Sequence, residues 1–489
     1  MIPFKYSLKG LPMPPSSNIY QNNQNINTPV PTGVPVSEPV ITANAPAQTA
    51  LSSKKKNSKP LIIIGIIILL LVLAMVFYRL FSKTSNKVSG EIVWWGLWES
   101  QSVVEPLIST YESTHPGVNI TYVEQSKEDY RERLSNSLAK GEGPDIFTFH
   151  NTWVPMFKSD LDALPPSVMT AADYSKNFYP VITSDLSYGN SIVGIPIGYD
   201  ALTLFINEDI FNKSGKTPPT NWDDLRDLAK ELTIKDDKGI ITQSGVALGR
   251  TENVDNWQDI LALLMIQNGV DLRNPVGDKA EGALTFFTLF SSVDGVWDTT
   301  LPTSTQAFAA GKLAMYIAPS WRVFDIQRQN PNLKYKTVPI PQLPKDSPDE
   351  VDITYATYWT QGVWSKSASK LAAWDFLSYM ASADSLQKLY QNESAVRNLG
   401  EAYPRTDMAS LLIDHPIIGS IIAQAPGARS WYLVSRTFDG ATGINTLISN
   451  YFGDAVNAVA DGEKSASEAL ETVAQGVAQV LAQYGISVR

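Results

Sequence analysis

The run EIVWWG (residues 91–96) is followed by a helical pattern over residues 103–114 and then by VNITYV (residues 118–123). An apolar run that ends in glycine is typical of a buried parallel strand. The helical pattern stops at the turn HPG (residues 115–117), because proline interrupts a helix and glycine permits a tight turn. Strand, helix and strand in this order form the βαβ unit of an α/β sheet, so an α/β fold is expected.

The same alternation continues along the chain. A second helix is expected over residues 127–140, and PDIFTF (residues 144–149) follows as a third strand. Later strands are expected at residues 192–196, 203–207 and 313–317, with a helix over residues 222–232 that Asn221 caps. Residues 88–489 exceed what one hydrophobic core usually supports, so two lobes are expected.

The stretch LIIIGIIILLLVLAMVFY (residues 61–78) is an unbroken run of 18 apolar or glycine residues. As a helix it would measure about 27 Å, close to the ~30 Å hydrocarbon core of a bilayer. We expect an uncleaved transmembrane signal anchor over residues 61–80, followed by a polar linker at residues 81–87. A cleaved signal peptide and a buried core helix are the alternatives, although a signal peptide is normally shorter and lies nearer the N-terminus.

Residues 1–60 are rich in Pro, Asn, Gln, Ser and Thr and show no sustained apolar period. Such a segment cannot bury enough apolar area to offset its chain entropy, so a disordered cytoplasmic tail is expected. The recurrence of Pro31, Pro35 and Pro39 leaves open a docking segment for a partner.

Composition excludes several classes of chemistry. The chain has no cysteine, which excludes disulfides, cysteine metal sites and a lipid-modified cysteine anchor. Its net charge is −10, and residues 1–87 contain a single acid, Glu38, so the remainder is strongly acidic and a nucleic-acid ligand is not expected. The three histidines, at positions 115, 150 and 415, are far apart, so neither a zinc site nor a catalytic triad is indicated. No metal, cofactor or catalytic residue is predicted.

Six segments together carry a family resemblance. They are YESTHPGVNITYV (111–123), LAKGEGPDIFTF (138–149), IVGIPIGYDALTLFINEDIFNKSG (192–215) with PPTNWDDLRDLAKEL (218–232), QAFAAGKLAMYIAPSW (306–321), GVWSKSASKLAAWDFLSYMAS (362–382) and the closing GEKSASEALETVAQGVAQVLAQYG (462–485). In this order they resemble the extracellular solute-binding proteins of ABC transporters, in the family-1, maltose-binding-like group, over nearly all of residues 90–489. Members commonly carry a cleaved signal or a lipidated cysteine, whereas this chain is expected to carry an anchor.

The resemblance implies a periplasmic-binding-protein-like (type II) Venus flytrap of two α/β lobes. The chain would cross between the lobes near residues 199–201, 358–361 and 398–405. Lobe 1 would then combine residues of about 88–200 and 361–400, and lobe 2 those of about 201–360 and 401–489. The implied function is binding of a sugar or oligosaccharide and its delivery to an ABC permease, with no bond broken.

The lysines before the apolar run slightly outnumber the basic residues after it, which favours a cytoplasmic N-terminus. An exported binding domain implies the same orientation, so we expect a single-pass cell-membrane protein with its C-terminal domain extracellular or periplasmic. A sensor that uses the same fold to signal through the inner tail is one alternative. An anchored carbohydrate-active hydrolase is another, but no spacing singles out a pair of carboxylates.

Ligands of open α/β sheets bind beyond the carboxyl ends of the strands. Aromatic residues recur at these places in the chain, and aromatic faces suit the C–H faces of a sugar ring, while Asp, Asn, Glu and Arg bind hydroxyl groups. The predicted ligand-binding aromatic residues are Trp95, Trp98, Trp153, Tyr199, Trp257, Trp321, Tyr358, Trp359 and Trp431. The predicted polar residues are Glu99, Asn151, Asp200 and Arg397.

Overall fold

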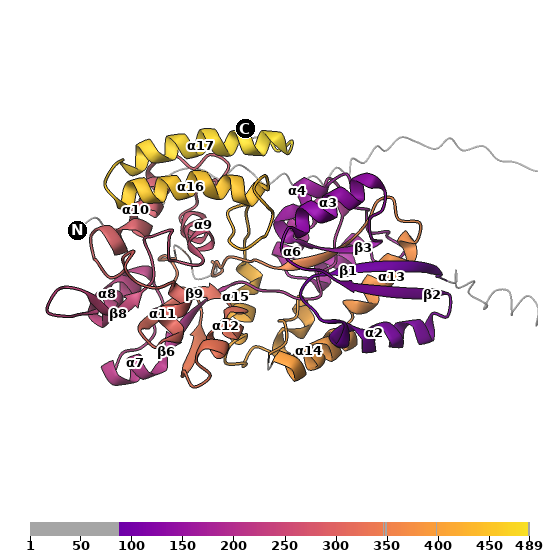
Figure 1. Ribbon diagram of the computed structural model, residues 1–489, viewed down its shortest axis with the longest axis horizontal. Coiled ribbons are helices and arrows are strands. Elements are labelled where there is room, and N and C mark those ends of the chain that lie inside the picture. The colour runs from indigo at the N-terminus through magenta and orange to yellow at the C-terminus, as the bar shows by residue number, and fades with distance from the viewer. Residues whose placement is uncertain (1–87, 346, 348–349, 398, 488–489) are drawn as a thin grey trace, which may run out of the picture. The chain divides into compact units, whose positions relative to one another are not determined.

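The computed structural model describes residues 88–345, 347, 350–397 and 399–487, and their ribbon is coloured in Figure 1. A four-stranded sheet in the order β11-β3-β1-β2 contains the predicted βαβ unit. Strands β1 and β2 pair in parallel from Gly90 opposite Val118 to Gly96 opposite Glu124. The strands are β1 (Gly90–Gly96), β2 (Val118–Glu124), β3 (Ile146–His150) and the antiparallel edge strand β11 (Trp359–Val363). We call this sheet and the helices packed on it lobe 1.

A second sheet has the order β10-β6-β9-β8-β7. Its central pair, β6 and β9, is antiparallel and buried along its whole length, whereas β8 runs parallel to β9. The strands are β6 (Leu202–Asn207), β7 (Ile234–Lys235), β8 (Ile241–Val246), β9 (Leu313–Pro319) and β10 (Tyr335–Val338). We call this sheet and its helices lobe 2.

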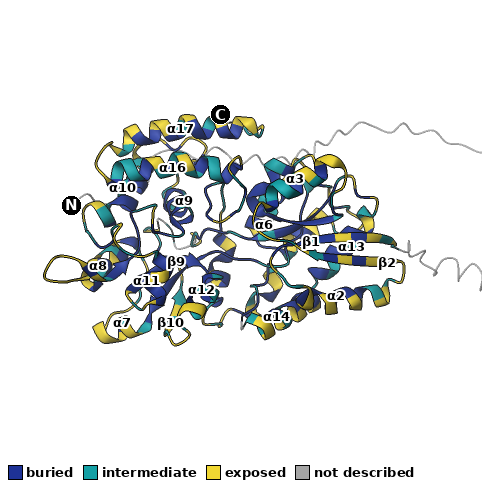
Figure 2. Cartoon of the chain, in the orientation of Figure 1, coloured by how far each residue is buried: buried dark blue, intermediate teal, exposed yellow. Residues whose placement is uncertain are grey.

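Helices cover both sheets, and Figure 2 shows buried strands inside and exposed helix faces outside. Lobe 1 carries α2 (Gln101–Thr114), α3 (Tyr130–Lys140), α4 (Val154–Phe157), α5 (Ala171–Asn177), α6 (Pro180–Asp185), α13 (Lys370–Met380) and α14 (Ala383–Arg397). Lobe 2 carries α7 (Glu208–Ser214), α8 (Trp222–Leu232), α9 (Trp257–Gln267), α10 (Asp278–Ser292), α11 (Ser304–Ala309), α12 (Arg322–Gln329), α15 (Gly419–Gln424), α16 (Ile444–Ala460) and α17 (Ala466–Gln483). Helices α16 and α17 pack side by side, and both also contact α10 (Figure 1).

Local sequence signals account for several element boundaries. The Asn221 side chain accepts a hydrogen bond from the Asp224 N–H, which confirms it as the N-cap of α8. The expected strand at residues 192–196 is wrong. Only Ser191–Ile192 forms strand β5, a short hairpin with β4 (Ser187–Tyr188), and Ile195 makes one isolated bridge to Gln361. Pro196 has no N–H to donate, so this segment cannot form a continuous ladder.

The segments that connect the lobes lie against one another. Tyr199 pairs with Ala402, and Ala201 pairs with Ala356, each in an antiparallel bridge. Asn398, at the start of the third expected crossing, lies outside the described residues. Connecting segments that are paired in this way can bend together, so a hinge between the lobes belongs at these bridges.

The expected tail, anchor and linker (residues 1–60, 61–80 and 81–87) lie outside the described residues. Within residues 88–345, 347, 350–397 and 399–487, no helix has the length and apolar character needed to cross a membrane.

Candidate functional site

A cavity of ≈ 280 Å³ lies where the carboxyl ends of β1 and β3 face the end of β9 and the start of α12. Both lobes contribute to its wall. Its aromatic lining consists of Trp94, Trp98, Tyr122, Tyr199, Trp321, Phe324, Tyr358, Trp359 and Phe438. Its charged lining consists of Glu99, Lys127, Asp200, Asp325, Glu393, Arg397, Glu401 and Arg436. The cavity therefore combines flat apolar faces with many groups that can bind hydroxyls.

The structure brings together eight of the thirteen residues predicted to contact ligand. These eight line the cavity: Trp98, Glu99, Tyr199, Asp200, Trp321, Tyr358, Trp359 and Arg397. They come from five separate parts of the chain, as expected for residues placed at strand ends and connecting segments.

The other five lie elsewhere. Trp153 is fully buried in lobe 1, and Trp257 is buried on α9, where its ring meets Gly453 of α16. Trp95 lies half-buried on β1, outside the cavity lining. Asn151 and Trp431 line a second cavity of ≈ 350 Å³, together with the buried carboxyl of Asp185. None of these five residues lines the first cavity, to which both lobes contribute.

Trp359 is the centre of an aromatic cluster on the lobe 1 wall. Its ring centroid lies 5.2 Å from Trp98, 5.2 Å from His150 and 5.3 Å from Trp153, each with an edge-to-face arrangement. Trp153 thus supports Trp359 from inside the lobe, while the Trp98 ring keeps 41% of its surface exposed. Rings fixed in this way offer a preformed stacking surface.

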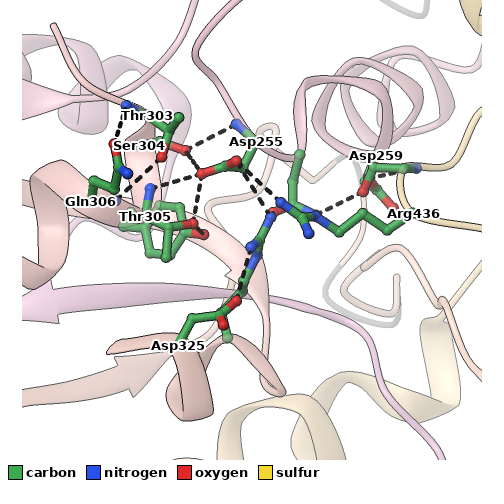
Figure 3. A network of polar contacts seen from close by, with 12 residues as sticks. Asp255, Asp259, Thr303, Ser304, Thr305, Gln306, Asp325 and Arg436 are labelled. Carbon is green, nitrogen blue, oxygen red and sulfur yellow. Dashed lines mark hydrogen bonds and ion pairs between the residues drawn. The ribbon is translucent and has the colours of Figure 1, made fainter. Parts of the chain in front are cut away.

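Trp321 provides the matching surface on lobe 2. It follows β9 after Ser320, and its ring lies 4.5 Å from the Arg322 guanidinium and 5.7 Å from that of Arg436. Figure 3 shows the polar network beside it, in which the Asp255 carboxylate accepts from the Thr305 N–H and hydroxyl at 2.9 and 2.6 Å. Arg322 and Arg436 approach Asp255 to 3.7 and 3.4 Å. These contacts pair the positive and negative side chains of the lobe 2 wall and hold them in place.

The Asp200 carboxylate joins a connecting segment to lobe 2. It accepts backbone N–H bonds from Ala201 at 2.7 Å, Ser320 at 3.0 Å and Trp321 at 3.1 Å. Burial raises the pKa of Asp200 to about 7, with a further rise from nearby Glu401, against the lowering effect of these N–H donors. Asp200 therefore fixes the position of Trp321 as well as lining the cavity.

Three glutamates surround a single arginine on the lobe 1 wall. Arg397 lies 3.2 Å from Glu99, 3.3 Å from Glu393 and 3.2 Å from Glu401. Burial raises the pKa of Glu99 to about 6, although Arg397 acts in the opposite direction. Sequence reasoning missed Glu393 and Glu401. The spacing of four residues between Glu393 and Arg397 was an available signal, because residues so spaced share a helix face, whereas Glu401 lies beyond the end of α14 and had no such signal.

Sequence reasoning also missed the loop that closes one side of the cavity. Arg436 and Phe438 both have a left-handed backbone, with φ of 54° and 51°, which is uncommon for residues other than glycine. Phe438 lies 5.9 Å from the Trp98 ring, and Lys127 lies 5.5 Å above the Phe438 ring. Nothing in the local sequence signals this conformation, which is held by contacts with lobe 1.

The described side chains of the two walls do not form a metal-binding site. Among the residues that the structure describes, no group of three or more His, Asp or Glu side chains is arranged to hold a metal ion. His150 is fully buried, and burial lowers its pKa to about 3, so it is neutral, with its ring nitrogens 2.9 Å from the Thr152 hydroxyl and 3.2 Å from the Thr357 hydroxyl. The site can bind a polar solute, with its aromatic faces and charged groups as the contacts.

The fold and the cavity define a two-lobed α/β protein that binds a ligand between its lobes. Residues 96–387 match the model of the bacterial extracellular solute-binding protein family. This chain belongs to that family, which confirms the resemblance seen in the sequence. Its members are receptors of transport systems that bind their solutes without transforming them, so the chain is not an enzyme.

Known relatives agree with this assignment. A putative binding protein of Brucella abortus is 25% identical over 302 residues, which is 59% of this chain and 71% of that protein. An ABC transporter solute-binding protein from Thermotoga lettingae, solved with α-D-tagatose, superposes with a TM-score of 0.61 at 21% identity, over 80% of this chain and 100% of that one. A cyclo/maltodextrin-binding protein complexed with maltotetraose gives a TM-score of 0.64 at 15% identity, over 80% and 97%. These structural likenesses confirm the two-lobed fold.

Proposed function

We propose that this chain captures a sugar or oligosaccharide between its lobes and delivers it to an ABC permease. The observation that carries the proposal is the cavity wall, in which Trp98 and Trp359 of lobe 1 face the lobe 2 residue Trp321 across a space lined with carboxylates and guanidinium groups. Stacking rings and charged hydrogen-bonding groups are the two kinds of contact that a sugar requires. The structural relatives solved with tagatose, maltotetraose and mannotriose support the same ligand class.

Binding would be coupled to closure. A ligand that touches both walls has a higher affinity for the arrangement in which the lobes meet, so it shifts the population toward that arrangement. The expected division into lobe 1 (about 88–200 and 361–400) and lobe 2 (about 201–360 and 401–489) belongs to this proposal. The permease would then recognise the closed form.

The proposal includes the membrane anchor. Residues 61–80 would span the bilayer, residues 1–60 would lie in the cytoplasm, and the two lobes would lie outside the cell membrane. The apolar run itself supports this part, because 18 consecutive apolar or glycine residues are long enough to cross the hydrocarbon core.

Thermal-shift measurement with the full chain tests the ligand class. The protein should be purified in a detergent without a sugar head group, because a maltoside could occupy the site. A carbohydrate that binds should raise the midpoint of unfolding, with about 2.7 kcal/mol of stabilisation when its concentration is 100 times Kd. Dipeptides and polyamines form the comparison panel. A shift with one of these and none with any carbohydrate would contradict the proposal.

A further inference from the structure

The lobe 1 wall carries more negative than positive charge. Glu99, Glu393 and Glu401 share one cation, Arg397, whose side chain is only 21% exposed. The lobe 2 wall differs, since Asp255 and Asp325 face the guanidinium groups of Arg322 and Arg436. Buried carboxylates are costly unless a cation or hydrogen-bond donor compensates them. The carboxylates therefore outnumber the cations on the lobe 1 side, even with Lys127, which also lines the cavity, but not on the lobe 2 side.

One oxygen marks where a donor is missing. Oε2 of Glu393 accepts the Glu401 N–H at 2.6 Å, whereas Oε1 is buried, lies in a residue 1% exposed, and has no donor among the described residues. In the ligand-free protein a proton held between Glu393 and the neighbouring Glu99 satisfies the pair, whereas with both carboxyl groups ionised neither can donate to the other. Glu393 is among the residues that line the cavity, and the neighbouring Glu99, whose side chain is 12% exposed, is the more accessible of the two.

The surrounding rings also suit a cation. Tyr122 of lobe 1 and Phe324 on α12 of lobe 2 both line the cavity, and the Arg397 guanidinium lies 5.2 Å from the Phe324 ring. Aromatic faces attract cations, and the attraction is larger where water is excluded.

We propose that the cavity takes a sugar that carries a protonated amine, and that its ammonium group lies against Glu99 and Glu393. The inference rests on the proposed function, because it assumes that the ligand is a carbohydrate. An ammonium group offers three donors and one positive charge, which matches the unpartnered oxygen and the excess of carboxylates.

Binding should release protons. Burial raises the pKa of Glu99 to about 6 and that of Glu393 well above its usual range, and the carboxylates repel one another. The titratable groups that face this pair are Arg397, Glu401, Tyr122, Tyr390 and Tyr403, with Asp200 beside Glu401. An ammonium group favours the ionised carboxylates and displaces their protons. Affinity should therefore rise as the pH increases through about 6, until the amine itself loses its proton.

Calorimetry with matched sugar pairs tests the inference on the full chain. Glucosamine, galactosamine and mannosamine, and the disaccharide of glucosamine, are each compared with the neutral sugar that has a hydroxyl in place of the amine. We expect at least one amine to bind about tenfold or more tightly than its neutral partner, with protons released into the buffer. The Glu393→Gln variant should lose this preference, and Glu99→Gln provides a second variant if the first fails to fold. Asp384→Asn, on the exposed side of the same helix α14, is the matched control and should keep it.

The outcomes separate this inference from the proposed function. Neutral sugars that bind as tightly as every amine would overturn the inference and leave the function standing. An amine preference that survives in both folded glutamine variants would also overturn it, because the ammonium group would then lie elsewhere. If no carbohydrate of either kind binds, the inference and the proposed function both fail.

Discussion

At the scale of single residues, the tryptophans show that one residue type has different roles in different surroundings. Trp359 lines the cavity, while Trp153 lies behind it and contacts it edge-to-face at 5.3 Å. Trp257 is 7% exposed and packs on α16. Removal of a cavity ring should cost binding, whereas removal of a core ring should cost stability.

Trp359→Ala and Trp321→Ala should each weaken ligand binding by about 1–3 kcal/mol, roughly 5- to 150-fold, because each removes a stacking surface. Trp257→Ala should instead lower the free energy of unfolding by about 3–5 kcal/mol, because it leaves a void in lobe 2. Calorimetry gives the affinity and a denaturant titration gives the stability. A loss of stability in the first two variants, with unchanged affinity in the folded fraction, would argue against an aromatic site.

Buried carboxyl groups set the expected pH dependence of stability. Burial raises the pKa of Asp185 and of Asp259 to about 6, and that of Asp200 to about 7. Each group holds its proton more tightly in the folded than in the unfolded chain. The resulting stabilisation is fully present below the unfolded pKa of about 4 and is lost as the pH rises through the folded value.

The free energy of unfolding should therefore fall between about pH 4 and pH 7. Asp259 offers a single-site check, because its Oδ1 is buried with no hydrogen-bond partner among the described residues, while Oδ2 accepts the Ser435 N–H at 3.0 Å. In Asp259→Asn the fall should be smaller by on the order of 1–3 kcal/mol, since the group no longer ionises. Urea titrations of both proteins across this range provide the measurement. Equal slopes would show that Asp259 stays charged throughout.

At the scale of elements, the start of α3 and the loop before α16 form a contact between the lobes beside the cavity. Arg131 of α3 donates to the Asp439 carbonyl at 2.8 Å and to the Thr442 hydroxyl at 2.6 Å. The non-glycine residues with a left-handed backbone in the described part of the chain, Asp129, Arg436 and Phe438, all lie in these two segments. Both segments are thus held in unusual conformations where they meet.

Arg131→Ala should weaken ligand binding by about 1–2 kcal/mol, roughly 5- to 30-fold, because its two bonds exist only while the lobes are in contact. Arg133→Ala is the matched control on the same helix, since Arg133 donates to the Glu128 and Ser126 carbonyls within lobe 1. Calorimetric titration of both variants with the same carbohydrate measures the two affinities. Equal losses of affinity would mean that the affinity depends on α3 itself and not on the contact between the lobes.

At the scale of the whole molecule, ligand binding and lobe closure should be visible together. Small-angle scattering of the full chain in detergent, with the micelle matched out by solvent contrast, should show a smaller radius of gyration when a saturating carbohydrate is added. The Arg131→Ala variant should need more ligand to reach the same radius. An unchanged radius at saturation would indicate a rigid module or a ligand held by one lobe.

The anchor is the other property of the whole molecule. An epitope tag at the N-terminus should stay on the membrane-bound chain and be protected from external protease, because residues 1–60 are proposed to lie inside. Detergent should release the protein, whereas high salt should not, because the attachment is hydrophobic. A mature chain that begins after Tyr78 would show that the segment is cleaved.

The sequence by itself determined the family, the first βαβ unit and the place of Trp321 and Trp359 at strand ends. These features depend on residues close together in the chain, where apolar period, caps and turns are visible. It also predicted eight of the residues that line the cavity, because strand ends and connecting segments in this family face the ligand.

Only the tertiary structure decided which side chains meet. Glu99 and Arg397 are almost 300 positions apart, yet they form an ion pair. The Glu393 oxygen, which has no donor in the described part of the chain, becomes apparent only when that pair is in place. Trp153 and Trp257 looked like cavity residues in sequence, but their burial depends on helices and rings from distant segments. Burial and missing hydrogen-bond partners are properties of packed neighbours, and a sequence pattern records only near neighbours along the chain.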